Sequence, residues 1–307
     1  MATDVTTAPE LSERGESRSF DGLRLAHERR QGSAGVPDIL YLHGFGQTRQ
    51  AWGPTAERLA QAGYGGLTVD GRGHGESDWN PAERPYSMEQ FVADAAGLAR
   101  TTLQKPILVG ASMGGLLGLL TEGESESGLY AALVLVDITP RWEPRGVERI
   151  LDFMGAHPEG FANLEAAAES IAYYLPHRRR RKTPAELSSL FVRHADGRWR
   201  WHWDPRLLDD VARDGARYQT RLMQAAARVR IPTLLISGGL SDLVSDATVD
   251  EFLALVPHAE HVRIADATHM VAGDRNDAFT GAVMTFLTTL RSPSMDRRSA
   301  PCPGVDP

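Results

Sequence analysis

The chain has 307 residues, long enough for one domain with an insertion or for two domains. Its formal net charge of -7 argues against nucleic acid as the main partner, because phosphate binding needs clustered Lys and Arg. No run of about 18 apolar residues predicts a membrane span, and the first residues lack a signal-peptide profile. The single cysteine, Cys302, excludes an internal disulfide framework and a cysteine-rich metal site. We therefore expect a cytoplasmic protein that makes no membrane contact.

Strand and helix patterns alternate along most of the chain. The segment S-R-S-F-D-G-L-R-L-A-H-E-R alternates around Asp21 and Gly22 and predicts an edge hairpin. Short runs rich in Val, Ile and Leu predict buried strands at 39–42, 66–69, 107–109, 131–136 and 233–236. Helical patterns lie between them, at 51–62, 88–103 and 116–120. This order predicts an α/β fold with a mostly parallel, doubly wound sheet.

The alternation stops for about 90 residues and then resumes. Segment 140–228 shows helical patterns, among them 165–173 and 184–193, and no convincing buried strand. We expect it to form a helical cap over the carboxyl edge of the sheet, where open α/β sheets bind ligands. The expected organisation is a core of 17–139 and 229–290, with disordered tails at 1–16 and 291–307.

One serine stands between a strand pattern and a helix pattern, in G-A-S-M-G (Gly110 to Gly114). A phosphate loop would need a Lys after its glycines, and a dinucleotide loop would need G-x-G-x-x-G, so neither fits. The remaining specific interpretation is a nucleophile elbow, in which Ser112 sits on a strained turn and the two glycines remove clashing side chains. The alternative is an ordinary turn serine.

A serine nucleophile needs a base and an acid that orients the base. Asp242 and His269 follow predicted strands 233–236 and 259–264, so both should reach the same sheet edge as Ser112. They also occur in the chain order Ser, Asp, His that this elbow requires. Asp137 ends strand 131–136 and is the alternative acid, although Asp242 is preferred.

A glycine-rich loop follows the first parallel strand, in Y-L-H-G-F-G-Q (Tyr41 to Gln47). Acyl transfer needs two N–H donors at the oxyanion of its tetrahedral intermediate. We assign these donors to the backbone N–H groups of Phe45 and Met113. His43, Gly44 and Gly46 are expected to support the loop, with His43 ordering it and not acting as a base.

Together these segments resemble a serine hydrolase of the α/β-hydrolase fold with a helical cap, over about residues 17 to 290. The resemblance depends on H-G-F-G (43–46), D-G-R-G-H-G-E-S (70–77), G-A-S-M-G (110–114), the G-x-x-D of 239–242 and T-H-M (268–270). In this family the D-x-R-G-H-G-x-S stretch is usually structural, which implies structural roles for Asp70 and His74.

The resemblance implies a carboxylic ester hydrolase that forms an acyl-enzyme on Ser112 and needs no cofactor or metal. A lactone is the nearest alternative substrate. Carbon–carbon bond hydrolysis and cofactor-free perhydrolase or haloperoxidase chemistry use the same triad and stay open. Relatives that attack carbon directly carry Asp at the position of Ser112 and are disfavoured. A small-molecule receptor on a hydrolase scaffold is the alternative from outside enzymology.

Two segments of the cap invite functional interpretations. Trp199, Trp201 and Trp203 are spaced two apart and would share one face of an extended segment. They favour packing of the cap onto the core, with lining of an apolar or aromatic ester pocket as the alternative. The basic run H-R-R-R-R-K (177–182) is interpreted as a solvated helix end or loop, with anion attraction as the alternative. Nothing in the sequence indicates an oligomeric state.

Overall fold

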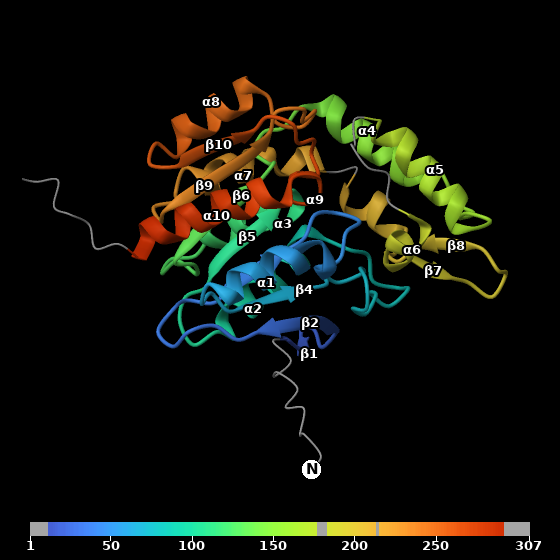
Figure 1. The fold of residues 1–307 in the computed structure, drawn as a ribbon, viewed down its shortest axis with the longest axis horizontal. Coiled ribbons are helices and arrows are strands. Elements are labelled where there is room, and N and C mark those ends of the chain that lie inside the picture. The colour runs from blue at the N-terminus through green and yellow to red at the C-terminus, as the bar shows by residue number, and fades with distance from the viewer. Residues whose placement is uncertain (1–11, 177–182, 213–214, 292–307) are drawn as a thin grey trace, which may run out of the picture.

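The computed structural model describes residues 12–176, 183–212 and 215–291, which form an α/β core with a smaller layer beside it (Figure 1). Within these residues the main sheet has eight strands in the order β1-β2-β4-β3-β5-β6-β9-β10. The β1–β2 and β2–β4 pairs are antiparallel, and all other neighbours are parallel. The predicted α/β fold with a mostly parallel sheet is confirmed. The strands are β1 (Ser12–Arg18), β2 (Arg24–Arg30), β3 (Ile39–Leu42), β4 (Gly66–Val69), β5 (Ile107–Ala111), β6 (Ala132–Val136), β9 (Thr233–Gly238) and β10 (Glu260–Ile264).

Both faces of the sheet are covered, because alternate strand residues point to opposite sides. Leu40 and Leu42 of β3 pack with the layer that contains α2, α3, α7 and α8, whereas Ile39 and Tyr41 pack with α1 and α10. This arrangement explains why the central strands read as apolar runs without polar positions. The core helices are α1 (Gly53–Gln61, after the turn η1, Arg49–Trp52), α2 (Met88–Arg100), α3 (Met113–Gly123), α7 (Gln219–Ala226), α8 (Asp246–Leu255), α9 (Val271–Asp274) and α10 (Asn276–Arg291).

The inserted layer stands to one side of the sheet, at the right of Figure 1. It contains two longer helices and a short antiparallel hairpin, which the sequence did not predict. Its elements are α4 (Pro144–Gly155), α5 (Leu164–Tyr174), α6 (Pro184–Leu187), η2 (Ser188–Leu190), β7 (Phe191–Arg193), β8 (Trp199–Trp201), the π-helical turn η3 (Leu208–Ala212) and the turn η4 (Gly215–Tyr218).

Three expected boundaries differ from the structure. β1 begins at Ser12, inside the range expected to be a tail, because it pairs along its whole length with β2. The helical pattern of 184–193 ends early, since Phe191 pairs with Trp201 across the hairpin. Helix α7, expected in the cap, packs on α3 so closely that a Cβ on Gly123 would lie 2.2 Å from the carbonyl oxygen of Ala225.

Some expectations fall on residues that the structure does not describe. The basic run 177–182, the first eleven residues and the segment that carries Cys302 lie outside the described ranges. Among the helices within those ranges, none is long and apolar enough to cross a membrane.

Candidate active site

Ser112 occupies the turn between β5 and α3 in a backbone conformation that few residues other than glycine adopt. Its φ is 47° and its ψ is −117°, a strained region that costs of order 1–3 kcal/mol. The turn is tight: a Cβ on Gly114 would lie 2.2 Å from the Leu42 carbonyl oxygen, and one on Gly110 would lie 2.5 Å from the Gly114 carbonyl carbon. The local structure is therefore that of a nucleophile elbow, with a helix N-terminus directly behind the serine.

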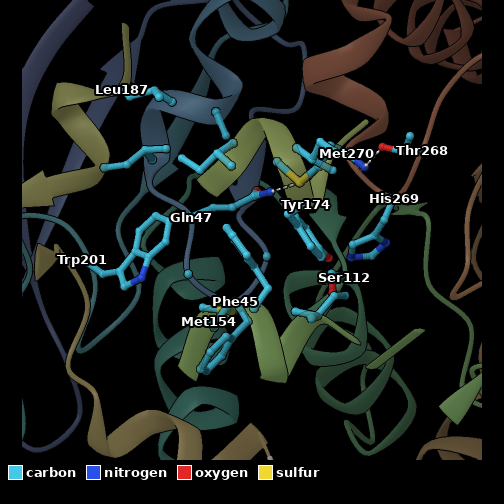
Figure 2. Close-up of a pocket in the computed structure, with 18 of the residues that line it drawn as sticks. Phe45, Gln47, Ser112, Met154, Tyr174, Leu187, Trp201, Thr268, His269 and Met270 are labelled. Carbon is cyan, nitrogen blue, oxygen red and sulfur yellow. Dashed lines mark hydrogen bonds between the residues drawn. The ribbon is translucent and has the colours of Figure 1, made fainter. Parts of the chain in front are cut away.

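His269 follows β10 and reaches the same cavity as Ser112. Figure 2 shows its imidazole turned toward the serine. The loop that carries it is braced by its neighbour Thr268, whose hydroxyl donates to Asp274 Oδ2 at 2.5 Å and accepts the Met270 N–H at 3.3 Å. These bonds tie the loop that carries His269 to α9.

The acid bound to this histidine is Asp137 and not Asp242. His269 Nδ1 donates to Asp137 Oδ2 at 2.8 Å. Asp137 is fully buried and also accepts the Gly238 N–H at 2.7 Å and the Ser241 hydroxyl at 2.5 Å. Three donors hold this carboxylate in one orientation, and its bond to Nδ1 leaves Nε2 of the imidazole for the serine.

Asp242 lies on the same cavity but faces the cap. Its Oδ2 accepts Arg149 Nη1 of α4 at 2.6 Å, and no hydrogen bond joins it to His269 within the described residues. The preferred acid of the sequence analysis is therefore wrong in the structure, and its alternative takes the place. Asp137 directly follows the last residue of β6 with a φ of 49°, which turns its side chain toward the β10 loop.

The glycine-rich loop after β3 is ordered by His43. His43 Nδ1 donates to the Gly44 carbonyl at 2.8 Å, and Nε2 accepts the Gly71 N–H at 2.9 Å. In the described part of the chain, the backbone N–H groups of Phe45 and Met113 make no hydrogen bond to another backbone group. Two backbone N–H donors without a backbone partner are what an oxyanion site requires.

Two further buried histidines hold the other side of this loop. His74 Nε2 accepts the Gly46 N–H at 3.1 Å while its Nδ1 donates to the Arg72 carbonyl at 3.0 Å. His202, from the cap, accepts the Gly75 N–H on Nδ1 at 2.8 Å and donates from Nε2 to the Gly46 carbonyl at 3.2 Å. Each ring needs its neutral form for both bonds.

Burial lowers the pKa values of His43, His74 and His202, and the pKa of His202 falls to about 4. Repulsion from neighbouring histidines lowers the pKa values of His74 and His202 further. Asp70 is also buried, and it pairs with the guanidinium of Arg49, as expected for a structural residue. We expected His43 to order the loop; His202 was not singled out, although it lies between the tryptophans of W-H-W.

The cavity over Ser112 has a volume of about 370 Å³ and is shared between core and cap. Figure 2 shows Ser112 and His269 on one side of it and Trp201 and Leu187 on the other. Trp201 and Trp203 line it, but Trp199 does not, because it sits at the far end of β8 and pairs with Phe161. Trp203 also packs on Phe45 of the core, with ring centroids 5.8 Å apart. It therefore both lines the pocket and packs the cap onto the core, the two roles considered for the tryptophan motif.

Residues 37–275 match the family model described as alpha/beta hydrolase fold, and the chain belongs to that family. It is 29% identical over 258 residues to 3-hydroxybutyrate-oligomer hydrolase of Cupriavidus necator, covering 80% of this chain and 87% of that protein. It is 29% identical over 302 residues to the mouse (Mus musculus) sn-1-specific diacylglycerol lipase ABHD11, covering 94% and 92%. The crystal structure of an alpha/beta hydrolase from Novosphingobium aromaticivorans superposes with a TM-score of 0.76 at 25% identity, covering 92% and 99%.

Other relatives of similar length are named esterases. With the family model, these similarities identify the chain as an ester hydrolase of the α/β-hydrolase fold.

Proposed function

We propose that this ester hydrolase works through an acyl-enzyme on Ser112. The observation that carries the proposal is the strained serine on a strand-to-helix turn, sharing one cavity with a histidine whose Nδ1 donates to a buried carboxylate. A structural role would not require a histidine with a buried acid partner to share a cavity with a serine on a strained turn. A receptor that only binds ligands would not require it either.

In the proposed reaction, Ser112 Oγ attacks the ester carbonyl while His269 Nε2 takes the hydroxyl proton. The N–H groups of Phe45 and Met113 bind the oxyanion, and loss of one such donor typically costs about 2.7–4 kcal/mol of transition-state stabilisation. Asp137 holds the imidazole in its orientation and stabilises the imidazolium. His269 then protonates the leaving alcohol oxygen, and water, deprotonated by the same histidine, releases the acid.

We propose a small neutral ester with a short or medium acyl chain as the substrate. The cavity is lined mostly by apolar side chains, and its volume of about 370 Å³ is small for a ligand pocket. The relatives named for 3-hydroxybutyrate oligomers and diacylglycerol support ester chemistry in a site of this kind. A lactone is an internal ester and would meet the same groups.

The test is hydrolysis of p-nitrophenyl esters from acetate to decanoate, with a small lactone as an extra substrate. Ser112→Ala should lower kcat by a factor on the order of 10⁴ or more, because the nucleophile is gone. Ser188→Ala, at an exposed serine of the cap, is the matched control and should keep the wild-type rate. Hydrolysis that survives in Ser112→Ala, or an inactive wild type, would refute the proposal.

A further inference from the structure

Two of the polar side chains that line the cavity, those of Gln47 and Tyr174, lack a strong hydrogen-bond partner within the described residues, and the proposed chemistry uses neither of them. Gln47 reaches it from the loop after β3, and Tyr174 reaches it from the end of α5. Most of the remaining wall is apolar, with Phe45, Ile150, Met154, Leu187 and Trp201 among its residues. Polar groups are rare in such a pocket and fix the orientation and identity of its ligand.

The amide of Gln47 is bound only weakly. Its Nε2 donates to the thioether sulfur of Met270 at 3.0 Å, across the cavity (Figure 2). A thioether is a poor acceptor, and no other hydrogen bond of this amide is found in the described residues. A Cβ on Gly44 would lie 3.2 Å from Ser112 Cβ and 3.7 Å from Gln47 Cδ, so the amide and the nucleophile flank the same bare glycine.

The hydroxyl of Tyr174 enters the cavity from the cap. Figure 2 shows this side chain directed toward Ser112 and His269. The ring is held firmly, since it stacks on Phe153 with centroids 4.1 Å apart and lies 4.7 Å below the guanidinium carbon of Arg149. Burial raises the pKa of Tyr174 to about 12, so the hydroxyl stays a donor at neutral pH. Its oxygen has no hydrogen bond within the part of the chain that the structure describes.

Arg149 and Asp242, two of the charged residues that line the cavity, are already engaged with each other. A third, Glu186, accepts hydrogen bonds from Thr183. Arg149 Nη1 binds Asp242 at 2.6 Å and Nη2 donates to the Tyr174 carbonyl at 2.5 Å. An anionic substrate would have to displace Asp242 to use this guanidinium, and it would meet the Asp242 carboxylate nearby. The wall therefore favours an uncharged polar group over a carboxylate.

Building on the proposed function, we propose that Gln47 and Tyr174 bind a second, uncharged oxygen of the substrate close to the scissile ester. The substrate class is carboxylic esters that carry an ether, keto, hydroxyl or second ester oxygen within a few atoms of the reacting carbonyl. The Gln47 amide exchanges its sulfur acceptor for this oxygen, and the Tyr174 hydroxyl donates from the cap. The two residues act as specificity determinants of the ester hydrolase.

The experiment compares matched ester pairs in which one methylene is replaced by an ether oxygen. One arm varies the acyl chain of p-nitrophenyl esters, and the other varies the alcohol of acetate esters, so the arms show which side of the ester carries the oxygen. Each kcat/KM is divided by the hydroxide rate of the same ester, which removes the electronic effect of the oxygen. For the wild type, the corrected kcat/KM of the best ether-containing ester should exceed that of its hydrocarbon partner by about tenfold, which corresponds to one or two hydrogen bonds.

Gln47→Leu and Tyr174→Phe should each reduce this preference by about threefold while the rate on the hydrocarbon ester changes little. That rate also reports whether each variant is folded. The matched controls are Gln61→Leu, at an exposed glutamine of α1 outside the cavity, and Tyr173→Phe, whose side chain is 91% exposed. Both controls should keep the wild-type preference.

Two results would overturn this inference. In the first, the hydrocarbon and oxygenated esters react alike in both arms. In the second, a succinate monoester that carries a free carboxylate is preferred to its neutral methyl ester. Either result can occur in a fully active enzyme, whereas failure of the proposed function would show as loss of all hydrolysis or as activity without Ser112. The two failures are therefore distinguishable.

Discussion

The core side and the cap side of the cavity are built differently. On the core side, Ser112, Asp137 and His269 follow the carboxyl ends of the parallel strands β5, β6 and β10. β9 lies between β6 and β10, and the sheet is covered on both faces. Asp137 is fully buried and accepts three hydrogen bonds. On the cap side, the wall includes stacked aromatic rings and Arg149, which pairs with Asp242 of the core. The side chains of this pair are 48% and 34% exposed.

This difference separates the groups that carry out the reaction from the wall that contacts the rest of the substrate. Groups that must be held within fractions of an ångström lie on a rigid sheet edge with satisfied hydrogen bonds. Of the two groups proposed to select the ester, Tyr174 lies on the smaller layer, attached by packing and by contacts that water can reach, whereas Gln47 lies on the core loop after β3. Substitutions of the catalytic groups at the sheet edge should therefore affect turnover strongly, whereas those on the cap side should affect selectivity and only modestly affect stability.

The largest effect outside the nucleophile is expected at the two acids. Asp137→Asn should lower kcat by a factor of about 10³–10⁴, because an amide cannot hold the imidazole in the required tautomer. Asp242→Asn removes only an exposed ion pair and should change kcat by less than about tenfold. Steady-state kinetics of both variants measure the contrast. Equal losses, or a greater loss in Asp242→Asn, would contradict the assignment of Asp137.

A smaller effect is expected from the buried histidines that join loop and cap. The folded pKa of His202, about 4, lies below the usual value of about 6.5, so acid protonates the unfolded chain first. The stabilisation is present above about pH 6.5 and is lost as the pH falls toward 4. Preferential protonation of His202 in the unfolded chain should lower the free energy of unfolding by roughly 2 kcal/mol between pH 7 and pH 5.

Urea denaturation at pH 7 and pH 5 measures this loss. His202→Asn should flatten the pH dependence while leaving the fold intact, since the asparagine side chain keeps an acceptor at a similar position. His258→Asn, at an exposed histidine, is the control and should leave the pH dependence as it is in the wild type. An unchanged slope in His202→Asn would exclude this histidine as its source.

The smallest effect is expected at the ion pair between cap and core. Arg149→Gln should change the unfolding free energy by less than about 1 kcal/mol, because both side chains are partly exposed and water screens them. The difference from wild type should shrink further in 1 M salt. Denaturation at low and high salt checks this; a salt-independent loss of several kcal/mol would show that the cap depends on this pair more than its exposure suggests.

The core was readable from the sequence because its signals are local. Three strands lie where the patterns predicted: those that lead into G-A-S-M-G, into the loop of His43 and into the loop of His269. Apolar runs fix the strands, and glycines fix the turns. The cap was less readable. Its segment 184–193 has a helical pattern, but only part of it is helical because Phe191 finds a strand partner ten residues away.

The sequence by itself determined the fold, the sheet edge and two of the three catalytic candidates, because these depend on periodicity and on residues next to a strand end. Only the tertiary structure decided between Asp137 and Asp242. Both residues follow strands at the same edge of the sheet. The φ of 49° at Asp137 turns its carboxylate toward His269, whereas Arg149 of the cap binds the carboxylate of Asp242. Gln47 and Tyr174 likewise gave no sequence signal, since an amide and a hydroxyl become a binding pair only where folded layers meet over Ser112.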